Sequence, residues 1–248
     1  MTISRLSNSE SRQAFEGEGV ATTNRIILAS NPLDSEGGIV APVKRIVAFD
    51  LGGVLVRIAK SWSEAMETAG LEHQSINGDQ FFHGCPEFEP YQAGKISESE
   101  YLAGLQRYLG LSSKEEALKA HNGILMVAYP GTVELVSELR AKGVPTACLS
   151  NTNAPHWVAM SNQDLFPGIA QLDHPILSHE VRAEKPHEEI YRIFESKTGF
   201  SPEQIIFFDD LQSNVDAAIA CGWTAFRIDP TTSTEPQLRA HLVELGIL

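Results

Sequence analysis

The sequence has few basic residues, few cysteines and no long apolar run. Lysine and arginine number 19 against 32 aspartates and glutamates, which gives a formal net charge of -13. General binding to nucleic acid or to an anionic membrane needs a basic surface, so this balance argues against both kinds of partner. We therefore expect the affinity for any anionic ligand to come from a local site.

The three cysteines argue against a disulfide framework. Cys85, Cys148 and Cys221 are odd in number and widely spaced, which is typical of a reducing compartment. No apolar run approaches the roughly 18 residues that a membrane span needs. We therefore expect a soluble, cytoplasmic protein, with Cys148 and Cys221 in its core because their neighbours are mostly small or apolar.

The chain of 248 residues is long enough for one α/β domain with an inserted subdomain, or for two small domains. Residues 1–43 mix polar and small residues with glycines and prolines that interrupt any period. We expect this N-terminal arm to be poorly ordered, and we assign it no function. Its amino end lacks a basic segment followed by an apolar core, so it does not resemble a signal peptide.

Asp50 follows a short apolar run, Ile46–Phe49, and precedes a turn that contains Gly52 and Gly53. The run is too short for a helix, is rich in β-branched and aromatic residues, and predicts a strand buried on both faces. Open α/β sheets bind ligands beyond the carboxyl ends of their strands, where Asp50 would lie. Taken alone, this stretch fits a structural aspartate before a turn equally well.

A helical pattern occupies residues 60–129. Apolar residues recur at helical spacing in three groups, over residues 62–69, 101–109 and 118–126. Ser97 and Glu100 predict a capping box before the second group. We interpret the segment as a small all-α insertion. Four aromatic residues are expected in its core: Phe81, Phe82, Phe88 and Tyr91.

Two later strands are also predicted to end in polar residues. Val144–Leu149 precedes Ser150–Asn153, and Ile205–Phe208 precedes Asp209 and Asp210. Two adjacent carboxylates repel each other unless a cation lies nearby, and carboxylate oxygens suit a hard metal ion. Read singly, the first ending is an ordinary turn or helix N-cap and the second an ordinary acidic turn.

Lys185 and Pro186 stand before a helix that we expect over residues 187–197. A lone lysine at such a place is normally solvated. Together with the three strand ends, however, it completes a set with chemical sense: a nucleophile, a hydroxyl donor to phosphoryl oxygens, a charge clamp and a metal site. In a parallel sheet all of these groups lie on one edge.

At these residues the chain, from about Lys44 to the C-terminus, resembles the haloacid dehalogenase superfamily. Its four motifs correspond in order to Phe49–Val54, Leu149–Thr152, Lys185–Pro186 and Phe208–Asp210. The resemblance implies an α/β fold, with a Rossmann-like parallel sheet, helices on both faces and an inserted all-α cap. It places the core at residues 44–59 and 130–248 and the cap at residues 60–129.

The resemblance also implies roles for the site residues. Asp50 would attack phosphorus to give an aspartyl-phosphate. Ser150 and the backbone amide of Asn151 would hold phosphoryl oxygens, and Lys185 would offset charge on Asp50 and the phosphoryl group. The expected cofactor is Mg²⁺, with a ligand set drawn from Asp50, the Gly52 carbonyl, Asp209, Asp210 and Asn214. Asp210 is the expected direct ligand of the final pair, and Asn214 would support a water on the metal.

The chain departs from the family pattern at Gly52. Most phosphatases of the superfamily have there a second aspartate, which protonates the leaving oxygen and later activates water. The sequence Asp50-Leu-Gly-Gly53 resembles the branch of bacterial α-D-glucose-1-phosphate phosphatases and relatives of the phosphatase domain of soluble epoxide hydrolase. The leading interpretation is a magnesium-dependent phosphatase of a small phosphorylated metabolite, such as a sugar phosphate.

Two alternatives remain at this point. A 2-haloacid dehalogenase also uses a nucleophilic aspartate without the second acid, although it needs no magnesium. A phospho-ligand binding or regulatory protein would have lost turnover through Gly52. One fold can host all three, so the fold class does not decide between them.

Overall fold

The structure is a computed structural model that describes residues 44–71 and 82–248. The described residues form one compact unit. The expectations for the arm at residues 1–43 and for Phe81 lie outside the described residues. Among the described helices, none has the length and apolar character needed to cross a membrane.

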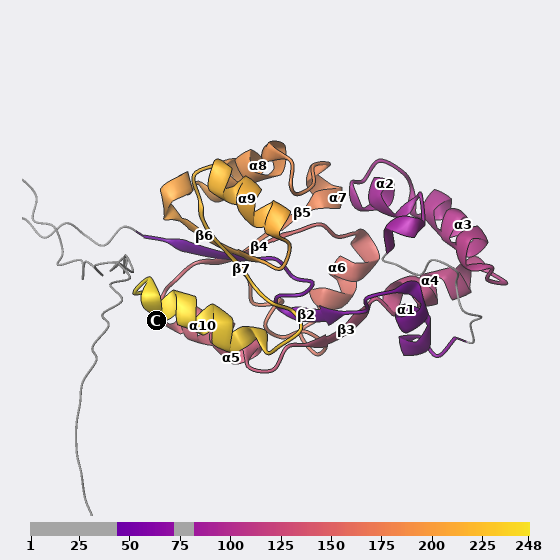
Figure 1. Cartoon of the computed structure of the whole chain (residues 1–248), viewed down its shortest axis with the longest axis horizontal. Coiled ribbons are helices and arrows are strands. Elements are labelled where there is room, and N and C mark those ends of the chain that lie inside the picture. Colours follow the sequence, from indigo (N-terminus) through magenta and orange to yellow (C-terminus); the bar gives the residue numbers. More distant parts are fainter. Residues whose placement is uncertain (1–43, 72–81) are drawn as a thin grey trace, which may run out of the picture. The chain divides into compact units, whose positions relative to one another are not determined.

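A five-stranded parallel sheet forms the centre of this unit, in the order β5-β4-β1-β6-β7 (Figure 1). The middle strand, β1, is buried along its whole length, as predicted for a strand with both faces covered. The strands are β1 Ile46–Phe49, β4 Thr146–Ser150, β5 His174–Leu177, β6 Ile205–Asp209 and β7 Thr224–Arg227.

Helices cover both faces of the sheet, because successive strand residues point to opposite sides. Val47 and Phe49 pack with α5 and α10, whereas Ile46 and Ala48 pack with α8 and α9. Figure 1 shows these two helix pairs on opposite sides of the strands. The Rossmann-like arrangement is therefore confirmed. The helices after the insertion are α5 Thr132–Ala141, α6 Ala154–Met160, α7 Ser178–Val181, α8 Glu188–Thr198, η2 Pro202–Gln204, α9 Gln212–Ala220 and α10 Thr234–Glu244.

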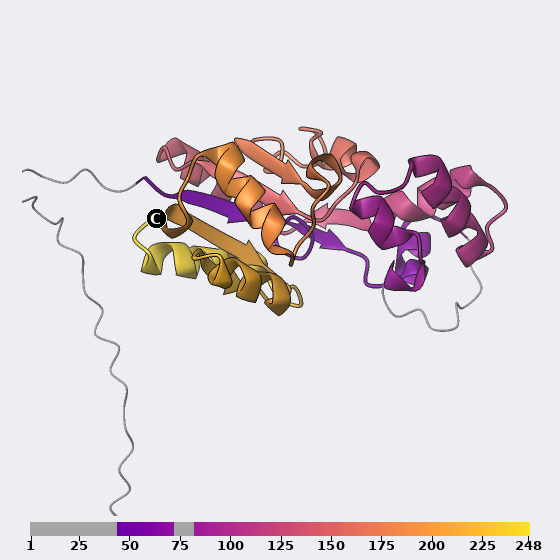
Figure 2. The same cartoon turned by 90° about the horizontal axis from the view of Figure 1, so that it is seen from above.

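An antiparallel hairpin of β2 (Val56–Ile58) and β3 (Leu125–Ala128) carries a group of helices between its strands. We call this group the helical insertion; it appears in Figure 2 in indigo to magenta. Its helices are α1 Trp62–Thr68, η1 Phe82–Gly84, α2 Phe88–Gln92, α3 Glu98–Leu109 and α4 Lys114–Asn122. They share an apolar cluster centred on the fully buried Trp62 and Tyr101. Phe82, Phe88 and Tyr91 belong to it, as expected.

The expected helix over residues 118–126 is wrong in its second half. Helix α4 ends at Asn122, and Leu125–Ala128 is the strand β3. A short apolar run fits either element by periodicity, and here pairing with β2 decides in favour of a strand. The range 60–129 that we expected to be all-α therefore contains one strand of the hairpin.

Several local predictions are confirmed. Ser97 and Glu100 form the capping box of α3: the Ser97 hydroxyl accepts from the Glu100 amide at 3.3 Å, and the Glu100 carboxylate accepts from the Ser97 amide at 2.9 Å. All three cysteines are free and buried. Burial raises the pKa of the Cys148 thiol to about 12, so this side chain is an inert part of the core.

Candidate active site

The predicted acids meet at the carboxyl edge of the sheet. Asp50 follows β1, Asp209 ends β6 and Asp210 follows it. Each offers one carboxylate oxygen to a group whose members all lie within 4.8 Å of one another. β1 and β6 pair in parallel with Phe49 beside Phe208, so the residues that follow them emerge together. The adjacent strands thus gather three acids from two distant parts of the chain.

Lys185 lies between two of these acids. Its ammonium is 3.0 Å from Asp50 Oδ1 and 2.6 Å from Asp209 Oδ2, and its side chain is only 1% exposed. Burial alone would lower the pKa of the lysine, but the two carboxylates outweigh that effect and raise the pKa above its usual value. A lone lysine before a helix is normally solvated, whereas Lys185 is a buried cation that lies beside Asp50, as the interpretation of the four motifs together predicted.

Asp209 is fully buried, and both of its oxygens are engaged. Oδ1 accepts from the Leu211 amide at 2.9 Å and from Asn214 Nδ2 at 3.0 Å. Oδ2 accepts from Lys185 Nζ, and Asn214 Nδ2 also lies 3.1 Å from it. The contacts of Asp209 therefore hold Lys185 in place, and the Asn214 amide is turned toward Asp209.

The site is short of positive charge. Burial raises the pKa of Asp50 to about 6; Lys185 opposes this increase, and Asp209 adds a smaller upward contribution. Burial, Asp50 and Asp209 together raise the pKa of Asp210 to about 7. Three acids with one lysine favour an additional cation, and oxygen ligands alone suit Mg²⁺. The donor set of the described residues thus fits the metal ion that the sequence implied.

Gly53 shapes this edge by letting the Asp210 carboxylate approach the backbone. Its φ is +77°, and a Cβ placed on it would lie 2.6 Å from Asp210 Oδ2. A side chain at position 53 would therefore displace the carboxylate, besides straining a left-handed backbone. The second glycine of the turn is required by the position of Asp210.

Ser150 ends β4 and is buried, on the strand next to β1. The side chain of the following Asn151 is tied to the backbone of Lys185 by two hydrogen bonds. Its Nδ2 donates to the Lys185 carbonyl, and its Oδ1 accepts from the Lys185 amide, both at 2.9 Å. The structure therefore joins the second and third motifs through the Asn151 side chain, a contact that the sequence did not predict.

The side chain of Ile58 occupies the space that a side chain at position 52 would need. A Cβ on Gly52 would lie 3.3 Å from Cδ1 and 3.4 Å from Cγ2 of Ile58, in strand β2. Such a contact is tight, so Ile58 would have to shift to admit any side chain at position 52. The sequence carries no signal for this contact, because only the path of the hairpin brings Ile58 back over the turn.

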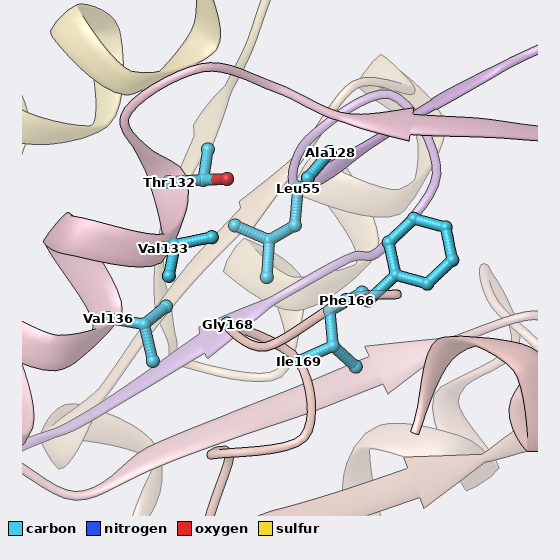
Figure 3. A pocket seen from close by; sticks show the side chains of 8 residues that line it. All are labelled: Leu55, Ala128, Thr132, Val133, Val136, Phe166, Gly168 and Ile169. Carbon is cyan, nitrogen blue, oxygen red and sulfur yellow. The ribbon is translucent and has the colours of Figure 1, made fainter. Parts of the chain in front are cut away.

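A small pocket elsewhere in the molecule is apolar (Figure 3). It is enclosed mainly by aliphatic side chains and Phe166, and none of the predicted site residues lines it. The lining residues are Leu55, Ala128, Thr132, Val133, Val136, Phe166, Gly168 and Ile169. The predicted residues converge instead on the polar edge around Asp50.

Curated relatives match most of the chain. Phosphatase MT3486 of Mycobacterium tuberculosis is 26% identical, over 82% of this chain and 95% of that protein. Hexitol phosphatase A of Escherichia coli is 25% identical, over 79% and 90%. D-ribitol-5-phosphate phosphatase of Bacteroides thetaiotaomicron is 27% identical, over 75% and 91%. The branch suggested by the Gly52 turn stays a prediction.

Solved structures share the fold. The HAD family enzyme bt-2542 of Bacteroides thetaiotaomicron, in a magnesium complex, has a TM-score of 0.67 and 25% identity, covering 79% of this chain and 98% of that chain. L-2-haloacid dehalogenase of Xanthobacter autotrophicus has a TM-score of 0.55 at 21% identity, covering 83% and 85%, which shows the fold alone. The family model for haloacid dehalogenase-like hydrolases matches residues 44–222, and the chain belongs to this hydrolase family.

Proposed function

We propose that the chain is a magnesium-dependent phosphatase that hydrolyses a small phosphomonoester, such as a sugar phosphate, through an aspartyl-phosphate on Asp50. The observation that carries this proposal is the ion pair between Asp50 and the buried Lys185, beside a further acid, Asp210, for which the described residues 44–71 and 82–248 provide no ion pair. The relatives named hexitol phosphatase A and D-ribitol-5-phosphate phosphatase support the substrate class.

Asp50 is held as an oriented carboxylate. Its Oδ1 accepts from the Leu51 amide at 2.7 Å and pairs with Lys185, which fixes the plane of the group at the strand end. In the proposed reaction an oxygen of Asp50 forms a bond to phosphorus, and the bond from phosphorus to the substrate's oxygen breaks. The departing oxygen keeps the electron pair and takes up a proton from water, because position 52 is a glycine and supplies no acid. Water then hydrolyses the aspartyl-phosphate and regenerates Asp50.

The remaining residues of the site would bind the phosphoryl group and the metal ion. The Ser150 hydroxyl and the Asn151 amide are assigned to the phosphoryl oxygens, and Lys185 offsets their charge together with that of Asp50. Mg²⁺ would be held by Asp50, the Gly52 carbonyl and Asp210. Asp209 and Asn214, which are hydrogen-bonded to each other, would support these ligands. The ion supplies the positive charge without which the acids repel a phosphate dianion.

A panel of phosphorylated metabolites, assayed with magnesium and with excess EDTA, tests the proposal. We expect hydrolysis of at least one sugar or polyol phosphate, lost in EDTA and lowered by roughly a thousandfold or more in Asp50→Asn. Full activity in EDTA or in Asp50→Asn would overturn the mechanism. Release of chloride from a 2-haloacid would indicate a dehalogenase, and phosphate-ester binding without turnover would indicate a binding protein.

A further inference from the structure

A buried polar cluster joins the helical insertion to the loop that follows β4. Tyr101 of α3 and His121 of α4 come from the insertion, whereas Asn153 and His156 come from the loop and from α6. All four side chains are buried, and the two imidazole rings stack with centroids 4.0 Å apart. We call these four residues the histidine cluster. The catalytic proposal uses none of them.

Hydrogen bonds in the cluster fix one arrangement of protons. Asn153 Oδ1 already accepts from the His156 amide at 3.1 Å, and His121 Nε2 lies 3.0 Å from the same oxygen. His121 Nε2 therefore carries a proton that it donates to Asn153. Its Nδ1 is then an acceptor, and the Tyr101 hydroxyl donates to it over 2.8 Å.

The same reasoning applies to the second histidine. Asn153 Nδ2 donates to His156 Nδ1 at 3.3 Å, so His156 carries its proton on Nε2, which donates to the His121 carbonyl at 2.9 Å. Burial lowers the pKa of both histidines, so both are neutral near pH 7. Every polar atom that these bonds involve is paired, which makes the junction rigid.

The loop between β4 and α6 is held at each residue after Ser150. Asn151 clamps the backbone of Lys185, as described above. The Thr152 amide donates to Ser178 Oγ at 2.9 Å, and the Ser178 hydroxyl lies 2.7 Å from the carbonyl of Gln92, at the end of α2. Asn153 binds His121. Two separate contacts, at Thr152 and at Asn153, thus connect the insertion to the proposed phosphoryl-binding loop.

We infer that His121 and Asn153 are positioning residues through which the helical insertion sets the place of Ser150 and Asn151. His121 donates to the side chain of Asn153, which lies three residues after the Ser150 hydroxyl. Without the His121 contact, the buried side-chain oxygen of Asn153 has one hydrogen-bond donor fewer. The loop then loses one of its two connections to the helical insertion. The inference deepens the proposed function and rests on it.

Inorganic phosphate, in the presence of Mg²⁺, is the probe that separates this effect from substrate recognition. Phosphate carries no leaving group that could touch the insertion, so a change in its affinity must come through the loop. We expect His121→Phe, which keeps the stacked ring but loses both hydrogen bonds, to weaken phosphate binding by about five- to tenfold. Isothermal titration calorimetry measures this affinity.

Three further variants make the test specific. His121→Gln keeps an N–H donor for Asn153 and should restore the affinity to within about twofold of the unmodified protein. Leu105→Ala is the matched control, since Leu105 is fully buried in the insertion and does not belong to the histidine cluster. It should lower the melting temperature and leave phosphate binding unchanged. If His121→Phe does not fold, Tyr101→Phe removes a single hydroxyl from the same chain of hydrogen bonds.

Equal phosphate affinity in His121→Phe and the unmodified protein would overturn the inference, and so would equal weakening by Leu105→Ala. If the unmodified protein neither binds phosphate with Mg²⁺ nor hydrolyses any ester of the panel, the proposed function fails instead. Hydrogen exchange then still tests the coupling: the amides of residues 151–153 should exchange faster in His121→Phe than in Leu105→Ala. Unchanged exchange in that loop would contradict the role given to His121.

Discussion

Among single residues, Asp210 is the acid whose loss should affect magnesium most. Both oxygens of Asp209 are engaged by Lys185, Leu211 and Asn214, whereas burial, Asp50 and Asp209 raise the pKa of Asp210 in spite of Lys185. We expect Asp210→Ala to raise the magnesium concentration needed for half-maximal activity by roughly tenfold or more. A magnesium titration of phosphatase activity measures the change.

Asp216→Ala is the control for this prediction. Asp216 is an exposed acid on α9, so its loss changes the net charge equally without touching the proposed metal site. The same magnesium requirement in Asp210→Ala and Asp216→Ala would show that the metal site is misplaced.

Gly53→Ala should act on the same site from the backbone side. The new Cβ would come within 2.6 Å of Asp210 Oδ2, so the carboxylate must move, and the left-handed backbone at φ +77° adds strain. We expect a higher magnesium requirement together with a loss of about 1 kcal/mol or more in stability. Gly110→Ala is the control, since Gly110 is also left-handed, at φ +67°, but has open space around it. Equal magnesium requirements in these two variants would contradict the account of Gly53.

Gly52 leads to a prediction about leaving groups. A positioned general acid is typically worth about 10²- to 10⁴-fold, and its absence should be felt most with poor leaving groups. We expect the rate to fall steeply from p-nitrophenyl phosphate to alkyl phosphates, with sugar 1-phosphates between them. A series of phosphate esters of increasing leaving-group pKa measures the slope. A flat dependence in the unmodified protein would show that another group already supplies the proton.

Restoring an acid at position 52 requires a second change. Ile58 lies 3.3 Å from the place of a Cβ on Gly52, so Gly52→Asp alone is crowded. The slope should flatten in Gly52→Asp combined with Ile58→Ala, and less in Gly52→Asp alone. Ile58→Ala by itself supplies no acid and should leave the slope steep, which makes it the control.

Among the elements, helix α3 depends on its N-terminal capping box. The Ser97 hydroxyl accepts from the Glu100 amide, and the Glu100 carboxylate accepts from the Ser97 amide and hydroxyl. Ser97→Ala should cost about 1 kcal/mol, which for a domain of this size lowers the melting temperature by about 2–4 °C. Ser112→Ala, at an exposed serine after the same helix, should change it little. Equal melting temperatures for the two variants would refute the capping role.

The strands of the sheet were predictable from local sequence because they are short apolar runs that end abruptly in polar residues. Ile46–Phe49 has the predicted bounds. The other two strands each end one residue later than expected, at Ser150 and Asp209, and the strand that ends at Ser150 also begins two residues later than expected, at Thr146. The hairpin of β2 and β3 was not predictable in this way. Its strands are 67 residues or more apart in sequence, and only their pairing distinguishes Leu125–Ala128 from a helix turn.

The same distinction applies to the site. The acids and Ser150 were predictable because residue type and strand position each point to one edge of a parallel sheet. Lys185 was predictable only together with them, because it lies in a loop before a helix and not at a strand end. The Asn151 clamp and the place of Ile58 were not, since both depend on how distant segments return to that edge. The residues that we propose carry the chemistry can be recognised by their type in the sequence, whereas those that position them are ordinary residues in particular contacts.

In the molecule as a whole, the buried histidines should make stability depend on pH in a definite direction. Burial lowers the pKa of His156 to about 4 from an ordinary 6.5, and lowers that of His121 as well. Between these values the unfolded chain binds more protons than the folded one, so stability rises with pH. The contribution of His156 is therefore complete above about pH 6.5 and is lost as the pH falls toward 4.

His156→Gln should remove this dependence while keeping an N–H donor for the His121 carbonyl. Between pH 7 and pH 5 we expect the unmodified protein to lose roughly 2 kcal/mol more unfolding free energy than His156→Gln, as a single group with these two pKa values requires. Burial raises the pKa of Asp50 and Asp210, which acts in the opposite direction but equally in both proteins, so the difference between them reports His156 together with its charge effect on His121. Urea titrations at the two pH values measure this difference in unfolding free energy.

His187→Gln, which removes an exposed imidazole, is the control and should behave as the unmodified protein. Parallel loss of stability in His156→Gln and the unmodified protein would mean that His156 is not held neutral by its burial.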